Sequence, residues 1–156
     1  MLKKRSMPKV SLISKSEEET KLCAQRLATQ LKAGDIVLLQ GDLGAGKTTF
    51  VKGLAQAFKV ALKKVNSPTF VIMNQYKGSL PLYHFDLYRL GNPKELDTLD
   101  FDEYFYGEGI SLIEWPERLG EHKLNQYYLV EFQHKGEHQR QICISYPSKL
   151  QPKFSH

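Results

Sequence analysis

The sequence predicts an α/β fold in which helices pack on a mixed β-sheet. Residues 16–35 and 48–58 carry apolar side chains at the spacing of amphipathic helices. The segments "DIVLLQ" and "GISLIEW" are nearly continuous apolar runs, which is typical of strands covered on both faces. Two other regions, 68–90 and 126–147, have the pattern of antiparallel strand pairs, so the sheet is not purely parallel.

A short first strand is expected at residues 9–14, with a helix after it. Ser16 and Glu19 have the spacing of a capping box, which marks the start of that helix. Gly34 suits its end, because glycine readily takes the left-handed conformation that closes many helices. Apolar residues recur on one helix face and should point to the core: Leu22, Cys23, Leu27 and Leu31.

The rest of the chain continues the alternation of strands and helices. We expect a central strand at residues 35–40, then a loop, and then the helix of residues 48–58. A strand pair should flank residues 77–79, and the following region is helical or irregular. The last expected strands are 109–115, which Pro116 closes, and two antiparallel strands on either side of Lys135 and Gly136.

The composition is that of an ordinary globular protein of one domain. The chain has 156 residues, of which 41% are apolar and 25% are charged. No apolar run has the length of a membrane span, and no secretory apolar segment follows the basic start. We therefore expect a cytoplasmic protein without a membrane partner. Cys23 and Cys143 are expected to be buried thiols outside any disulfide.

The net charge of +5 lies in the first 15 residues. The remaining chain is neutral, because it holds 17 basic and 17 acidic side chains. A basic tail of this kind favours at most a weak contact with RNA or an acidic partner. A solvated terminus is the simpler interpretation.

The stretch "GDLGAGKTTF" matches the phosphate-binding pattern G-x-x-x-x-G-K-[ST]. A strand pattern precedes it and a helix pattern follows it, as this motif requires. Its glycines let backbone N–H groups turn inward, and the helix start adds attraction for phosphates. Lys47 should reach the β- and γ-phosphates, and the Thr48 hydroxyl should bind Mg²⁺. The expected nucleotide-binding residues are Gly41, Asp42, Leu43, Gly44, Ala45, Gly46, Lys47, Thr48 and Thr49.

A P-loop also needs an acid at the end of a neighbouring strand to hold Mg²⁺ or its water. Glu114 ends a wholly apolar run and is assigned to the metal. Asp86 ends an alternating segment, typical of an edge or antiparallel strand, and is assigned to orienting water or the γ-phosphate side. Taken alone, each acid also fits a helix cap or an ion pair. His84 is placed on the opposite face of its strand from Asp86, as a packing or supporting residue. Trp115, the only tryptophan, is expected near the nucleotide.

Several function classes share a P-loop. A GTPase is disfavoured, because the chain has no N-K-x-D for guanine and no D-x-x-G after the P-loop. A small-molecule kinase stays open on size, although Arg89 and Arg118 are isolated and form no arginine-rich lid. A nucleotide-sensing module without catalysis is a third alternative.

Four segments in this order and spacing, "GDLGAGKTTF", "NSPTF", "YHFDLYRL" and "LIEWPE", resemble the TsaE family, also called YjeE. The resemblance runs from about residue 17 to about residue 147. It implies a cytoplasmic, P-loop NTPase-like three-layer sandwich that uses Mg²⁺ and hydrolyses ATP to ADP and phosphate. It also implies work with the TsaB and TsaD proteins, which transfer threonylcarbamoyl to adenosine 37 (t6A) of tRNAs that read ANN codons. Contact with tRNA itself would be indirect or weak.

By position, the resemblance assigns two sets of functional residues. Those needed for activity are Lys47, Asp86, Glu114 and Trp115, and the metal ligands are Thr48 and Glu114. Residues 67–69 match a switch-like segment of the family.

Other family contacts match this chain only loosely. Nucleotide contacts from the first helix and the last hairpin would fall near Ser16, Glu17 and Arg140. Asp100 departs from the family pattern, which has glycine there. We divide the chain into a basic extension with the first strand (1–15), a P-loop ATPase domain (16–148) and a C-terminal tail (149–156).

Overall fold

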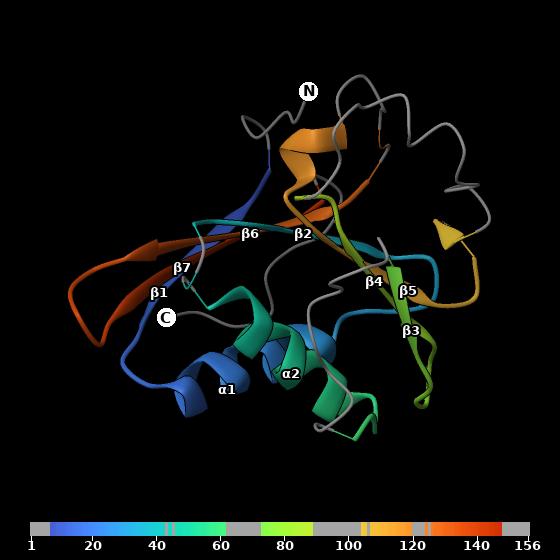
Figure 1. Ribbon diagram of the computed structural model, residues 1–156, viewed down its shortest axis with the longest axis horizontal. Coiled ribbons are helices and arrows are strands. Elements are labelled where there is room, and N and C mark those ends of the chain that lie inside the picture. Colours follow the sequence, from blue (N-terminus) through green and yellow to red (C-terminus); the bar gives the residue numbers. More distant parts are fainter. Residues whose placement is uncertain are drawn as a thin grey trace.

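The computed structural model describes residues 7–42, 44, 46–61, 73–88, 104–105, 107–119, 124 and 126–147. Within these residues, seven strands form one sheet in the order β1-β7-β6-β2-β5-β4-β3 (Figure 1). The strands are β1 (Lys9–Ser14), β2 (Ile36–Gln40), β3 (Met73–Tyr76), β4 (Leu82–Asp86), β5 (Ile110–Glu114), β6 (Tyr128–His134) and β7 (Arg140–Ser145).

Parallel and antiparallel pairs combine in this sheet, which confirms the predicted mixed α/β fold. The four middle strands β6, β2, β5 and β4 are parallel to one another. Antiparallel strands extend the sheet at both sides, β3 beside β4 and the pair β7 and β1 beside β6. Strand β2 lies at the centre of the parallel block, as its apolar run predicts.

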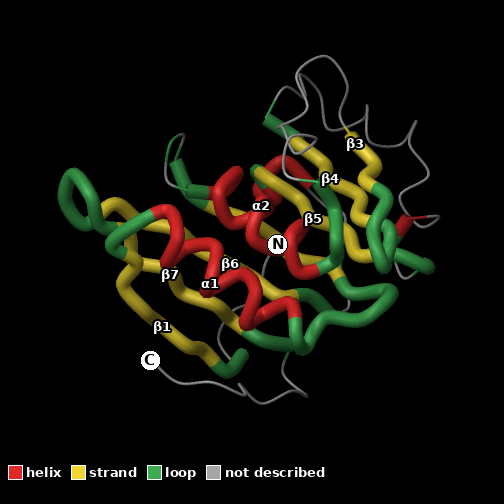
Figure 2. Tube along the Cα trace, turned by 90° about the horizontal axis from the view of Figure 1, so that it is seen from below, coloured by secondary structure: helices red, strands yellow, loops and turns green. Residues whose placement is uncertain are grey.

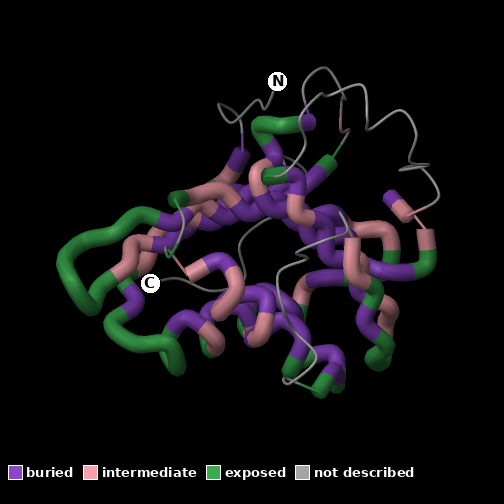
Figure 3. Tube along the Cα trace, viewed as in Figure 1, coloured by how far each residue is buried: buried purple, intermediate pink, exposed green. Residues whose placement is uncertain are grey.

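Both described α-helices cover the same face of the sheet, α1 (Glu17–Ala28) and α2 (Lys47–Ala57) (Figures 1 and 2). The 3₁₀ turn η3 (Pro116–Leu119) contributes to the layer on the other face. Side chains of β2 alternate between the layers: Val37 and Leu39 join the helix-side core, whereas Ile36 and Leu38 join the opposite one. The sheet is therefore buried on both faces along its centre (Figure 3).

Helix α1 begins where the capping box predicts. The Glu19 N–H donates to the Ser16 hydroxyl at 3.1 Å, and the Glu19 carboxylate accepts from the Lys15 N–H at 2.7 Å. The helix ends at Ala28, with Thr29 as its C-cap, so the predicted end at Gly34 is wrong. The Gly34 N–H instead donates to the Gly109 carbonyl, which ties the entry of β2 to that of β5.

One residue of the predicted apolar face of α1 does not reach the core. Cys23 and Leu27 are buried, but Leu22 is 54% exposed. Leu22 precedes Cys23 by one residue, so a turn of 100° carries it away from the side that contacts the sheet. Cys143 on β7 is half-buried, and no disulfide joins it to Cys23.

The antiparallel pairs form as predicted around residues 77–79 and around Lys135 and Gly136. Residues 68–72 and most of the helical or irregular region 92–105 lie outside the described residues. Strand β1, which the prediction groups with the basic extension, pairs along its full length with β7 and so belongs to the same sheet as the strands of the predicted main domain. Of the helices in the described part of the chain, none is both long and apolar enough to span a membrane.

Candidate nucleotide-binding site

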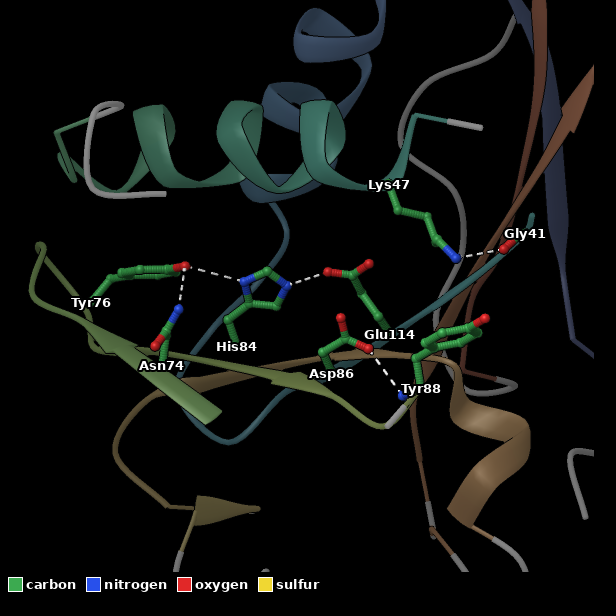
Figure 4. A network of polar contacts seen from close by, with 8 residues as sticks. All are labelled: Gly41, Lys47, Asn74, Tyr76, His84, Asp86, Tyr88 and Glu114. Carbon is green, nitrogen blue, oxygen red and sulfur yellow. Dashed lines mark hydrogen bonds and ion pairs between the residues drawn. The ribbon is translucent and has the colours of Figure 1, made fainter. Parts of the chain in front are cut away.

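Three parallel strands bring their carboxyl ends to one edge of the sheet. Leu39 of β2 is in register with Glu114 of β5, and Glu114 is in register with Asp86 of β4. The phosphate-binding loop follows β2 directly, so both predicted acids lie beside it (Figure 4). Strand β4 pairs antiparallel with β3, which agrees with one of the two predicted alternatives, and parallel with β5, so among the described strands it is not an edge strand.

The loop between β2 and α2 depends on glycine conformations. Gly44 and Gly46 have φ angles of 79° and 107°, in the left-handed region that side-chain-bearing residues rarely adopt. Gly46 is also the N-cap of α2, and the Phe50 N–H donates to its carbonyl. The loop therefore leads straight into a helix start, where backbone N–H groups attract anions.

A cavity of about 700 Å³ opens in front of this helix start. Four parts of the chain line it: the start of α1, the loop with the first turn of α2, the ends of β4 and β5, and the turn between β6 and β7. The lining residues are Lys15, Ser16, Glu17, Thr20, Gly44, Gly46, Lys47, Thr48, Thr49, Asp86, Tyr88, Glu114, Trp115, Glu137, His138 and Arg140. Its size suits a small organic ligand with phosphates.

Lys47 is a buried cation at the centre of the site, with 5% of its surface exposed. Its Nζ donates to the Gly41 carbonyl at 2.5 Å and lies 3.9 Å from the centroid of the Trp115 ring. Burial lowers the pKa of Lys47, and the carboxylates of Glu114 and Asp86 oppose that shift. A phosphate group would supply the negative charge that favours the protonated amine.

The two acids differ in their surroundings. Glu114 is buried at 3% exposure, and its Oε2 lies 2.5 Å from Nε2 of His84. Asp86 is half-buried, and its Oδ1 accepts a hydrogen bond from the Tyr88 N–H at 3.0 Å. Burial raises the pKa of Asp86, the Tyr88 bond opposes the shift, and the charge of Glu114 adds to it.

His84 lies on the same face of β4 as Asp86, so its predicted placement on the opposite face is wrong (Figure 4). Side chains two residues apart on a strand share a face, and this spacing could have identified it. His84 is fully buried and contacts Glu114 on the neighbouring strand. It was therefore missed as a direct partner of the predicted metal acid.

Trp115 turns the chain at the end of β5. Its φ angle of 60° is unusual for a residue with a large side chain, and the Arg118 N–H donates to its carbonyl as η3 begins. The ring lies beside Tyr88, with centroids 4.7 Å apart, and beneath the Lys47 amine. This conformation puts the indole at the wall of the cavity.

The oxygen donors of the site suit Mg²⁺. Thr48 and Glu114, the predicted ligands, and Asp86 all line the cavity, and hydroxyl and carboxylate oxygens are ligands that Mg²⁺ prefers. Among the described residues there is no group of three or more His, Cys, Asp or Glu that could hold a metal. Magnesium in such a site usually takes only one or two protein carboxylates and completes its shell with phosphates and waters.

The remaining predicted residues fall into three groups. Gly44, Gly46 and Thr49 line the cavity, while Gly41 binds Lys47 through its carbonyl. Asp42 is exposed and acts on Lys47 only through its charge. The predicted positions outside the described residues are Leu43, Ala45 and residues 67–69. The cavity also includes Ser16, Glu17 and Arg140, the loosely matched positions.

A glycine loop between a buried strand and a helix, with carboxylates at the ends of the next two strands, defines a protein with a P-loop NTPase-like fold. Residues 14–142 match the family described as "Threonylcarbamoyl adenosine biosynthesis protein TsaE". The chain belongs to this family, which takes part in the synthesis of threonylcarbamoyladenosine in tRNA.

Individual relatives agree with the family match. The chain is 44% identical over 129 residues to TsaE of Bacillus subtilis strain 168, covering 82% of this chain and 80% of that protein. It is 52% identical over 100 residues to TsaE of a Synechocystis strain, covering 61% and 62% of the two chains. The crystal structure of Bacillus subtilis YdiB superposes with a TM-score of 0.74 at 34% identity, covering 90% of this chain and 87% of that one.

Proposed function

We propose that this protein is an ATP-binding and ATP-hydrolysing subunit of a tRNA-modifying assembly. It works in the cytoplasm with the TsaB and TsaD proteins, which carry out the threonylcarbamoylation of adenosine 37 in tRNAs that read ANN codons. The chain does not form that bond itself. Its ATP cycle, slow when the chain is alone, permits repeated turnover of the partners, and its own contact with tRNA is indirect or weak.

One observation carries the proposal: a buried lysine and two carboxylates converge on one cavity at a helix start. Lys47, Asp86 and Glu114 come from three different elements, yet all line the same cavity. A structural ion-pair cluster would have no need of a loop with left-handed glycines and a cavity beside it. Binding of a nucleotide triphosphate explains all of these features together.

Each residue then has a defined task. Backbone N–H groups of the loop and the start of α2 bind the phosphates, and Lys47 exchanges the Gly41 carbonyl for phosphate oxygens. Thr48 and Glu114 hold Mg²⁺, which when bound neutralises charge on the phosphates. Asp86, whose pKa is raised by burial, orients the attacking water beside the γ-phosphate side. Trp115 packs against the Lys47 amine and keeps water from it.

A reconstituted modification assay tests this function. TsaB, TsaD, unmodified tRNA and an activated threonylcarbamoyl donor are combined with or without this chain and ATP, and t6A is counted per TsaD molecule. We expect many modified tRNAs per TsaD only when both the chain and ATP are present.

Two lysine variants give a matched control for that assay. Lys47→Ala should abolish the stimulation, because it removes the buried amine of the cavity. Lys52→Ala, further along α2 and outside the cavity lining, should retain it. Equal t6A yields with and without ATP would contradict the proposal.

A further inference from the structure

A row of polar contacts runs from the edge strand β3 to the predicted metal acid (Figure 4). The Asn74 amide donates to the Tyr76 hydroxyl oxygen at 3.5 Å. That hydroxyl lies 3.2 Å from Nδ1 of His84, and Nε2 of His84 lies 2.5 Å from Oε2 of Glu114. Three neighbouring strands, β3, β4 and β5, thus contribute to one continuous row ending at the cavity.

With a neutral His84 ring, the row has a consistent direction of donation. A neutral His84 that carries its proton on Nε2 donates to the Glu114 carboxylate. Its Nδ1 then accepts from the Tyr76 O–H, whose oxygen accepts from Asn74. In this arrangement each ring nitrogen of His84 has a partner of the matching kind on a neighbouring strand.

Burial makes these contacts difficult to replace. His84 is fully buried, Glu114 is 3% exposed and Tyr76 is 5% exposed, so the two contacts of the His84 ring are shielded from bulk water. A glutamate side chain has three rotatable bonds, and its carboxylate would otherwise take several orientations at the strand end. The His84 contact holds Oε2 and so fixes the plane and direction of the whole carboxylate.

We propose that His84 is a positioning residue, which holds the Glu114 carboxylate in the orientation that Mg²⁺ requires, with Tyr76 fixing the His84 ring. This inference rests on the proposed nucleotide and metal function of the site. Hydrogen-bonding partners behind a metal ligand commonly change metal affinity by about 10- to 100-fold when removed. The effect should fall on the metal-dependent part of nucleotide binding and leave the phosphate grip of the loop intact.

Calorimetry of a non-hydrolysable ATP analogue, in excess Mg²⁺ and in EDTA, separates those two parts. For the unaltered chain, the ratio of the two affinities defines the gain that Mg²⁺ provides. His84→Phe should reduce that gain about tenfold or more, while its affinity in EDTA stays within about threefold. Tyr76→Phe, which removes one hydroxyl, should reduce the gain by a smaller factor.

A pair of amide variants supplies the test of positioning. Gln at position 84 can bring an N–H close to where Nε2 of histidine lies, whereas Asn reaches only the place of Nδ1. His84→Gln should therefore recover most of the gain from Mg²⁺, and His84→Asn should not. Tyr83→Phe is the matched control, because Tyr83 belongs to the core on the opposite face of β4 and should leave the gain unchanged.

Two results would overturn the inference. One is an undiminished gain from Mg²⁺ in His84→Phe and His84→Asn. That result includes an equal loss of affinity in Mg²⁺ and in EDTA, which would make His84 a packing residue only. In case His84→Phe does not fold, the comparison of His84→Gln with His84→Asn decides between the same outcomes. Absence of nucleotide binding by the unaltered chain would overturn the proposed function itself, and this inference with it.

Discussion

Lys47 and Asp86 differ in what surrounds them, and this difference predicts separate roles. Lys47→Ala should weaken ATP binding by about 10- to 100-fold, since charged hydrogen bonds contribute about 1.5–3 kcal/mol. Asp86→Ala should lower turnover by about a hundredfold or more and change affinity only slightly, because the proposed role of Asp86 is to orient the attacking water. Binding is measured by calorimetry in EDTA and Mg²⁺, and turnover by phosphate release.

The two variants must be compared under identical conditions, with the folded fraction checked by circular dichroism. An equal loss of nucleotide affinity in both would contradict the separate roles. So would a Lys47→Ala variant that binds normally but turns over slowly.

At this scale, the sequence was sufficient to predict that Lys47, Glu114 and Asp86 lie together at one cavity, because motif spacing and strand ends identify these positions. It was not sufficient for the Lys47 contact with Trp115 or the register of Asp86 with Glu114, since both depend on strand pairing across distant segments. His84 was placed on the wrong face, although its two-residue spacing from Asp86 was sufficient to correct this.

At the scale of elements, the packing of α1 on α2 positions the helix start that follows the predicted phosphate-binding loop. Gly53 lies where the two helices meet, and a Cβ there would come within 2.7 Å of the Lys21 carbonyl oxygen and 2.8 Å of the Ala24 Cβ. Real Cβ atoms do not approach backbone so closely, so one helix would have to move. The helix start that lines the cavity belongs to α2 and would move with it.

Gly53→Ala should therefore destabilise the chain by about 1–3 kcal/mol, although alanine is the better helix former by about 1 kcal/mol. Thermal unfolding should show a lower midpoint, by several degrees for a chain of this size. Lys52→Ala on the same helix serves as the control and should shift the midpoint little. A Gly53→Ala variant as stable as the unaltered chain would contradict the close helix contact.

Element boundaries were less predictable than element types. The apolar pattern of residues 16–35 continues to Leu31, which is buried, although the helix already ends at Ala28. Leu31 is buried because of the turn that follows the helix, and apolar periodicity does not distinguish a residue of the helix from a residue of that turn. Strand β4 has the alternating pattern of an edge strand, but β3 pairs with its outer side. Alternation reports only the difference between the two faces of a sheet and does not show whether a strand lies at the edge.

At the scale of the whole molecule, one thiol and two phenol groups buried in the helix-side core make the stability of the fold depend on pH. Burial raises the pKa of Cys23 from 9.0 to about 12 and that of Tyr128 from 10.0 to about 12. Burial also raises the pKa of Tyr146, whose ring packs on Tyr128. The folded chain keeps these protons to higher pH than the unfolded chain does. Stability is therefore fully present below about pH 9 and falls as pH rises toward 12.

Cys23→Ala should flatten the first part of that fall. Each group whose protonation differs contributes a slope of about 1 kcal/mol per pH unit, and Cys23 has the lowest unfolded pKa of the three. Urea unfolding between about pH 8 and pH 10.5 measures this slope. Cys143→Ala is the control, because Cys143 is only half-buried and its removal should leave the slope unchanged. A slope in Cys23→Ala equal to that of the unaltered chain would contradict the assignment of this loss of stability to Cys23.

The order of the strands in the sheet could not be predicted from the sequence. Strand β2 pairs with β6, about ninety residues further along the chain, and β1 pairs with β7 near the other end. Such pairings depend on how all helices and strands pack together in the core, whereas apolar periodicity shows only which residues are buried. The fold class was accessible because a phosphate loop between strand and helix, together with antiparallel patterns, restricts the alternatives to a mixed α/β sheet.

The most direct measurement of the central claim is the rate of ATP hydrolysis by the purified chain, alone and with TsaB and TsaD. We expect a slow rate alone that changes clearly when both partners are present, and no hydrolysis by Lys47→Ala in either condition. A rate that is the same with and without the partners would contradict the account, because the ATP cycle would then not be coupled to the tRNA-modifying assembly.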